Sequence, residues 1–138
     1  MNTLYETTVE VTGGRNGKIR SEDGILELEV RTPKELGGVG GHTNPEQLFA
    51  AGYAACFDSA LNLVMSQEKV KPSAPSLVKA IVGLNQNGQG GYGLSVALAV
   101  TIPGVSQEQA QQLVEKTHMV CPYSNATRGN VDVQLQVV

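Results

Sequence analysis

The residues best suited to carry chemistry in this 138-residue chain are its two cysteines, Cys56 and Cys121. A lone pair 65 positions apart is no disulfide framework, and in a reducing compartment it is more often two free thiols or a redox couple. Cys56 lies in an apolar run, where the simplest interpretation is a small buried side chain. Cys121 precedes Pro122, at a junction whose backbone need not stay helical. A peroxide-reducing thiol and its resolving partner would need such placements.

That chemistry requires a group that activates the thiol, because an ordinary thiol with a pKa near about 8.5 is mostly protonated at neutral pH. Arg15, presented in the glycine-rich turn 13–17, could stabilise a thiolate and the charge on a leaving oxygen. Glu46 could hold Arg15 through a bidentate ion pair. From the residues alone, a solvated turn arginine and a glutamate that favours a helix N-terminus are the simpler interpretations.

A helix is predicted to begin after Asn44, which suits an N-cap and is followed by Pro45. Gln47 stands where it could return a reciprocal contact to the cap. Residues 48–57 are apolar on every side of this helix, which indicates a central buried helix, and the pattern breaks at residues 71–75.

The remaining elements follow from alternation and from capping residues. Period-two alternation predicts strands near residues 5–11, 26–30, 78–84, 94–102 and 131–137, with a turn at 87–91 that makes a hairpin. Ser106 with Gln109 caps a second helix to about Met119, and Pro122 opens a short further helix. We therefore expect one α+β domain, residues 1–138, with mainly antiparallel sheets packed around central buried helices.

Charge and composition exclude several classes of function. The net charge is -3 with a pI near 5.3 and no run of Lys or Arg, which argues against nucleic acid and membrane partners. The longest apolar stretch, residues 48–57, is about half of a membrane-spanning helix. The N-terminus has neither a basic nor an apolar signal region, so we expect a cytoplasmic protein.

Four segments resemble the organic hydroperoxide resistance (Ohr) proteins of the Ohr/OsmC family of bacterial peroxidases. They are GGR at 13–15, ELGG at 35–38, TNPEQLFAAGYAACF at 43–57 and VCPYSNATRGN at 120–130. The last is similar to the organic-hydroperoxide branch rather than the osmotically induced branch. Outside these segments the chain differs from the family pattern in two places. The glycine loop around Val39 and His42 is about one residue shorter than in many relatives, and Asp58 stands where a less polar residue is expected. These departures could alter access or substrate preference.

The resemblance implies an OsmC-like fold and a cysteine-based mechanism. Cys56 would be the peroxidatic cysteine and Cys121 the resolving one, with Arg15 and Glu46 as the charged pair that activates Cys56. A hydroperoxide would become an alcohol, leaving a Cys56 sulfenic acid and then a Cys56–Cys121 disulfide. The resemblance further implies dihydrolipoyl groups on a lipoylated protein as external dithiol reductant, and no metal, haem or flavin cofactor.

Helix geometry adds an expectation about assembly. Glu46 and Cys56 are ten positions apart, about 15 Å along one helix, too far to share a compact site within a chain. If Arg15 and Glu46 do flank Cys56, we expect an intertwined two-fold homodimer with active sites at the subunit interface. A helix break near Gly52 is the competing explanation.

Apolar side chains near both cysteines would suit the alkyl, aryl or fatty-acyl part of an organic hydroperoxide. They are Phe49, Tyr53, Phe57, Met119 and Val120, and simple core packing is the alternative for some of them.

Two other functions stay open. His118 and Cys121, at i and i+3, could bind zinc together with Cys56 and a carboxylate. The chain could also be a non-catalytic domain that binds apolar ligands in a dimer cleft.

Overall fold

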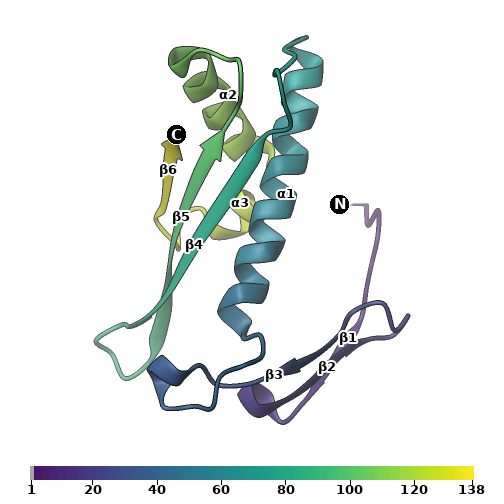
Figure 1. Cartoon of the computed structure of the whole chain (residues 1–138), viewed down its shortest axis with the longest axis vertical. Helices are drawn as coiled ribbons and strands as arrows, with labels where there is room; N and C mark the ends of the chain where they lie inside the picture. The colour runs from purple at the N-terminus through teal and green to yellow at the C-terminus, as the bar shows by residue number, and fades with distance from the viewer. Residues whose placement is uncertain (1) are drawn as a thin grey trace. The chain divides into compact units, whose positions relative to one another are not determined.

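The computed structural model describes residues 2–138, which form an α+β fold in two compact units, residues up to Leu48 and Phe49–Val138. The two units are unit 1 and unit 2 below, and each is described by itself (Figure 1). The expectation of one domain over 1–138 stays a prediction.

Unit 1 is built on a three-stranded antiparallel sheet. Its elements are β1 (Val9–Thr12), the 3-10 turn η1 (Gly14–Asn16), β2 (Gly17–Ser21), β3 (Glu27–Val30) and the 3-10 turn η2 (Lys34–Leu36), with sheet order β1-β2-β3. Gly13 and Gly14 have positive φ angles of 79° and 55°, which lets the chain turn tightly into η1. The sequence did not predict β2. The first predicted strand is shorter than expected, because β2 ends at Ser21 opposite Val9.

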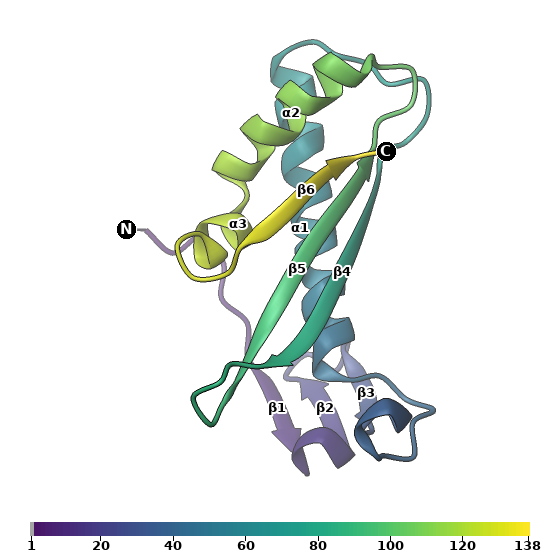
Figure 2. The same ribbon diagram turned by 90° about the vertical axis from the view of Figure 1, so that its left-hand side faces the viewer.

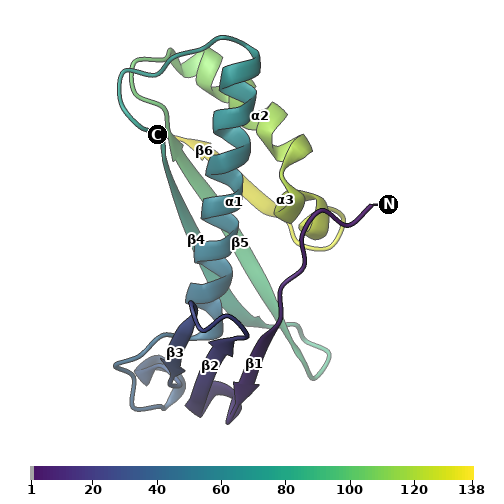
Figure 3. The same ribbon diagram turned by 90° about the vertical axis from the view of Figure 1, so that its right-hand side faces the viewer.

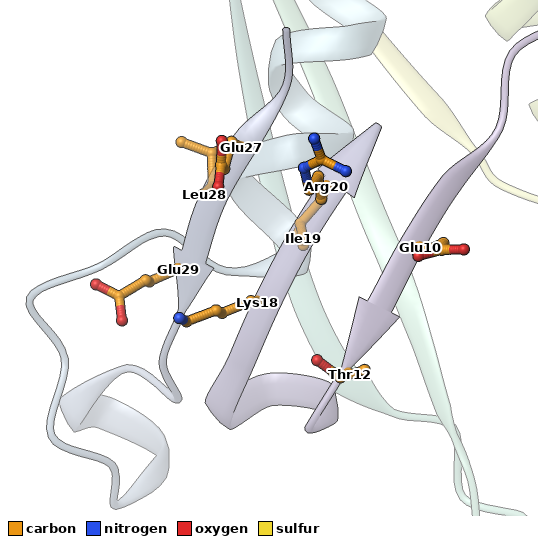
Figure 4. A pocket seen from close by; sticks show the side chains of 8 residues that line it. All are labelled: Glu10, Thr12, Lys18, Ile19, Arg20, Glu27, Leu28 and Glu29. Carbon is orange, nitrogen blue, oxygen red and sulfur yellow. The ribbon is translucent and has the colours of Figure 1, made fainter. Parts of the chain in front are cut away.

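The two faces of this sheet differ in polarity. One face carries the row Glu10, Arg20 and Glu27 across the strands, with Lys18 opposite Glu29 beside it. Figure 4 shows these side chains lining a pocket of about 630 Å³ that lies entirely within unit 1. Opposite charges in register stabilise neighbouring strands weakly, so this face is typical of a solvated sheet surface.

Unit 2 combines a second sheet with three helices. Its elements are α1 (Pro45–Gln67, whose first residues belong to unit 1), β4 (Leu77–Gln86), β5 (Tyr92–Thr101), α2 (Gln107–Val120), α3 (Pro122–Thr127) and β6 (Val133–Val137). β4 and β5 form the predicted hairpin, and β6 pairs with β5 in parallel after the crossover through α2 and α3. Figures 2 and 3 show α1 and α2 on the same face of this sheet.

The core of unit 2 lies between that sheet face and the helices. Alternate residues of β5 point inward, and they pack against the buried side of α1. The buried members include Val96, Leu98, Val100, Tyr53, Phe57, Leu61, Leu113 and Val114.

Helix α1 is buried on one side only within the single chain, which differs from the all-round burial expected. Ala51, Ala55 and Leu63 are exposed, because the sheet and α2 cover a single side of the helix. By length and composition α1 could span a membrane, but core helices pass the same test. Its buried side forms the core of unit 2.

The predicted helix starts are confirmed in their caps. The Asn44 side-chain oxygen accepts from the Gln47 N–H at 2.9 Å, and Ser106 accepts from the Gln109 N–H at 3.2 Å. The reciprocal contact from Gln47 is wrong: its side-chain oxygen accepts from the Thr43 hydroxyl at 2.9 Å. Helix α1 continues through residue 52 without a break.

Candidate active site

The two cysteines come from different elements of unit 2 and lie next to each other. Cys56 is in the middle of α1, whereas Cys121 is the last residue before α3 and donates its N–H to Thr117 of α2 at 2.9 Å. Their sulfur atoms are 3.9 Å apart, and both cysteines are free thiols. Cys121 is fully buried and Cys56 is partly exposed. A disulfide needs the two sulfurs at about 2.05 Å, so a small movement would join them.

The surroundings of Cys56 within unit 2 do not favour its ionised form. Burial raises the pKa of the Cys56 thiol, and the neighbouring Cys121 adds to that rise. The backbone N–H of Tyr123 opposes them, because it hydrogen-bonds to the Cys56 sulfur and lowers the pKa. The balance is a raised pKa, so a reactive thiolate at this position needs a further positive group.

Arg15 and Glu46 form the predicted bidentate ion pair within unit 1. Arg15, in the turn between β1 and β2, donates from Nη1 and Nη2 to the two carboxylate oxygens of Glu46 at 2.8 and 2.6 Å. The hydrogen bond from Arg15 holds the pKa of Glu46 below its ordinary value and raises that of Arg15. The side chains are 35% and 16% exposed, so the guanidinium is fixed in orientation yet open to solvent.

The five apolar residues expected to line a substrate pocket divide into two groups. Tyr53 and Phe57 are completely buried in the core of unit 2, as the core-packing alternative describes. Phe49 is partly buried, and Met119 and Val120 are 63% and 50% exposed. Phe49, Met119 and Val120 thus have surface to offer a ligand. Whether any of the five binds substrate stays a prediction.

Comparison with known proteins places this arrangement in a family. The model of the OsmC-like protein family matches residues 38–136. An organic hydroperoxide resistance protein of Xanthomonas axonopodis pv. citri is 50% identical over 133 residues, covering 96% of this chain and 93% of its own. The chain belongs to the Ohr/OsmC family.

Other members agree over the full length. The organic hydroperoxide resistance protein OhrA of Bacillus subtilis is 49% identical to this Ohr-family chain, with 97% and 96% of the two chains covered. The crystal structure of an organic hydroperoxide resistance protein from Elizabethkingia anophelis has a TM-score of 0.94 at 57% identity, covering 99% and 98%. The OsmC-like α+β fold expected from the sequence is therefore confirmed.

Sequence reasoning missed a buried polar cluster behind Cys121 in this Ohr-family chain. The Tyr53 hydroxyl hydrogen-bonds to Ser124 Oγ at 2.8 Å and to Thr127 Oγ1 at 3.2 Å, and Ser124 Oγ also contacts His118 Nδ1 at 2.8 Å. The sequence offered one signal for this cluster. Ser124 and Thr127 stand at i and i+3 of the short helix, and a buried tyrosine hydroxyl needs such hydrogen-bond partners.

The same cluster engages His118, one of the two residues on which the zinc alternative rests. His118 Nδ1 is occupied by Ser124, and the pKa of His118 is lowered by burial and then by the Arg128 charge. Among residues 2–138, no group of three or more His, Cys, Asp or Glu side chains could hold a metal ion.

Asp58, the polar departure beside Cys56, has a structural partner in unit 2. Its carboxylate accepts from the Ser76 hydroxyl at 2.6 Å, and its backbone oxygen accepts from Asn62 at 2.7 Å. The side chain therefore ties α1 to the segment that leads into β4.

Proposed function

We propose that this Ohr-family chain is a thiol-dependent peroxidase that reduces alkyl, aryl and fatty-acid hydroperoxides to alcohols in defence against oxidative stress. The observation that carries the proposal is the pair of free thiols 3.9 Å apart, with Cys56 partly exposed and Cys121 buried behind it. A peroxide can approach the first sulfur, and the second is ready to react with the product. The names of the relatives support the class of substrate.

The reaction balances in two steps. The Cys56 thiolate attacks the terminal oxygen of ROOH, the O–O bond breaks, and the RO⁻ group takes a proton to leave as alcohol while Cys56 becomes a sulfenic acid. Cys121 then attacks that sulfur, an S–S bond forms, the S–O bond breaks and water leaves. Closing the disulfide protects Cys56 from irreversible over-oxidation.

Arg15 is the proposed source of the missing positive charge. Its guanidinium would stabilise the Cys56 thiolate and the charge that develops on the departing oxygen, while Glu46 fixes its orientation. Because α1 is continuous from Pro45 to Gln67, Glu46 cannot fold back along the helix toward Cys56. We therefore propose a homodimer in which each Arg15–Glu46 pair serves the cysteines of the other subunit.

The reductant and the setting rest on family resemblance. We propose an external dithiol, dihydrolipoamide carried on a lipoylated protein, which would reopen the Cys56–Cys121 disulfide by thiol–disulfide exchange. No bound cofactor takes part in this scheme, and the proposed compartment is the cytoplasm. The exposed side chains Met119 and Val120 would contact the apolar part of the hydroperoxide.

Replacing each cysteine by serine tests the proposal. Cys56→Ser should abolish the consumption of cumene hydroperoxide, because no nucleophile remains. Cys121→Ser should allow one turnover and then stop at a Cys56 sulfenic acid, detectable by mass spectrometry after trapping with dimedone. The proposal is wrong if Cys56→Ser sustains multiple turnovers with folded protein.

A further inference from the structure

Gly52 and Tyr123 make an unusually close contact within unit 2. A Cβ atom added to Gly52 would lie 2.8 Å from the Tyr123 hydroxyl oxygen and 3.2 Å from two ring carbons. Glycine is unfavourable in the interior of a helix, so its presence at position 52 of α1 calls for an explanation from packing. The tyrosine ring, which rests on the bare backbone at this position, is that explanation.

Gly52 and Cys56 are one helical turn apart, so they lie on the same face of α1. The ring of Tyr123 covers the first of these positions. A backbone hydrogen bond from the same residue lowers the pKa of the thiol at the second. One tyrosine thus spans a turn of α1, with its side chain at one end and its amide at the other.

Other contacts fix the first turn of α3 in this place. The Tyr123 ring packs against Tyr53 at a centroid distance of 5.7 Å and edge-on against Phe49 at 6.5 Å. The next residue, Ser124, is buried and hydrogen-bonds to both Tyr53 and His118. These contacts leave the Tyr123 ring little freedom on the α1 side, although it is 39% exposed.

We propose that Gly52 and Tyr123 are positioning residues: the Tyr123 ring, seated on Gly52, holds the start of α3 so that the Tyr123 amide donates to the Cys56 sulfur. The inference rests on the proposed function, in which Cys56 is the nucleophile. The amide would supply a hydrogen bond to the Cys56 thiolate that adds to the charge of Arg15. The same contact keeps Cys121, two residues earlier, within reach of the oxidised sulfur.

The groups near Cys56 in unit 2 that can titrate or carry charge include Asp58, two residues along α1, whose carboxylate is bonded to Ser76, and the tyrosines Tyr53 and Tyr123. Cys121 faces it directly. His118 on α2 and Arg128 after α3 lie behind the Ser124 contact, and the Arg128 guanidinium donates to the His118 backbone oxygen and to Asn125. All variants are compared in one Cys121→Ser background and leave His118 and Arg128 in place, so their differences do not come from these groups.

The experiment compares four single variants and one double variant in a Cys121→Ser background, where Cys56 is the only thiol. Gly52→Ala adds the methyl under the ring, Tyr123→Ala removes the ring, and Tyr123→Phe keeps the ring without its hydroxyl. Tyr92→Ala is the matched control, because it removes a 70% exposed tyrosine ring from β5 of the same unit. Alkylation of Cys56 by iodoacetamide, followed against pH, reports the pKa of the Cys56 thiol.

Gly52→Ala and Tyr123→Ala should each raise that pKa and slow alkylation below it about tenfold, as loss of one hydrogen bond to a charged group would. Tyr123→Phe and Tyr92→Ala should match the parent. In the double variant Gly52→Ala/Tyr123→Ala the added methyl should have no further effect, because the ring it would displace is gone.

Unchanged alkylation in Tyr123→Ala would overturn the inference, and so would equal losses in Tyr123→Phe and Tyr123→Ala. If Gly52→Ala does not fold, as judged by circular dichroism, the Tyr123 pair of variants still decides. Alkylation needs no peroxide, so this test is independent of the proposed function. A wild-type chain that consumes no hydroperoxide would refute the peroxidase and leave the alkylation result standing.

Discussion

Glu46 has two separable effects at the scale of single residues: it contributes to stability through its ion pair, and it fixes the direction of Arg15. Because Arg15 is 35% exposed, solvent screens the pair, and its loss should cost at most about 1 kcal/mol of the free energy of unfolding. The effect on the orientation of the Arg15 guanidinium should be larger, because two hydrogen bonds of 2.8 and 2.6 Å to Glu46 hold the guanidinium in one plane.

Glu46→Gln should therefore lower peroxidase activity much more than stability, with kcat/KM down by roughly tenfold or more. Glu29→Gln is the control, because it removes the Arg31–Glu29 pair, whose carboxylate is the more exposed, from the same unit and should leave activity unchanged. Comparable activity in the two variants would show that Glu46 does not act through Arg15.

The small stability effect of Glu46 should also depend on pH. Arg15 holds the pKa of Glu46 below its ordinary value of 4.5, so the pair stabilises the folded chain fully above that value. Its contribution disappears as the pH falls through the lowered pKa. Urea unfolding of wild type and Glu46→Gln should therefore differ at pH 7, begin to converge below pH 4.5 and agree once the pH is below the lowered pKa of Glu46.

The site residues differ in how far the sequence could predict them. From the residues alone, a small buried Cys56, a solvated Arg15 and a helix-terminal Glu46 were the simpler interpretations. The family resemblance was what implied a Cys56–Cys121 pair and an Arg15–Glu46 pair, and in the structure the members of each pair lie close together. Tyr53 was expected to line a pocket, yet its hydroxyl is buried against Ser124, since burial depends on contacts far apart in the chain. The contact between Gly52 and Tyr123 could not be predicted from the sequence either, because it joins residues that are far apart in the chain, on α1 and α3.

At the scale of elements, the strongly periodic and well-capped segments were predicted with the right type. The hairpin β4–β5, helix α2 and helix α3 have alternation, a serine cap and a proline start respectively. Strand β2 was missed because Ile19 is the only apolar side chain among its five residues, so the sequence shows no alternation of apolar and polar residues there although the burial alternates.

Helix α1 has more apolar surface than a single chain buries. Its residues are apolar on every side, yet the sheet and α2 bury only one side and leave Ala51, Ala55 and Leu63 exposed. An exposed apolar face on a long helix indicates that something else covers it. In the proposed homodimer, a second copy of the chain would cover this face and would bring the Arg15–Glu46 pair of one subunit to the cysteines of the other.

At the scale of the whole molecule, the shared-site proposal predicts complementation between inactive chains. Co-refolded Cys56→Ser and Arg15→Ala proteins should recover roughly a quarter of wild-type activity on random pairing, because half of the dimers are mixed and each has one working centre. Each variant refolded alone is the control. Mixed dimers without activity would place Arg15 and Cys56 of one site in the same chain and leave the peroxidase proposal intact.

Cys56 and Cys121 are proposed to act together on an organic hydroperoxide, and counting the thiols of the treated protein tests this cooperation. Reduced protein treated with one equivalent of cumene hydroperoxide per chain should lose both of its thiols. Intact mass should fall by about two hydrogen atoms as the intramolecular disulfide forms, and one equivalent of alcohol should appear. Retention of both thiols would refute the peroxidase proposal, and loss of a single thiol with added oxygen as the end product would refute the role of Cys121.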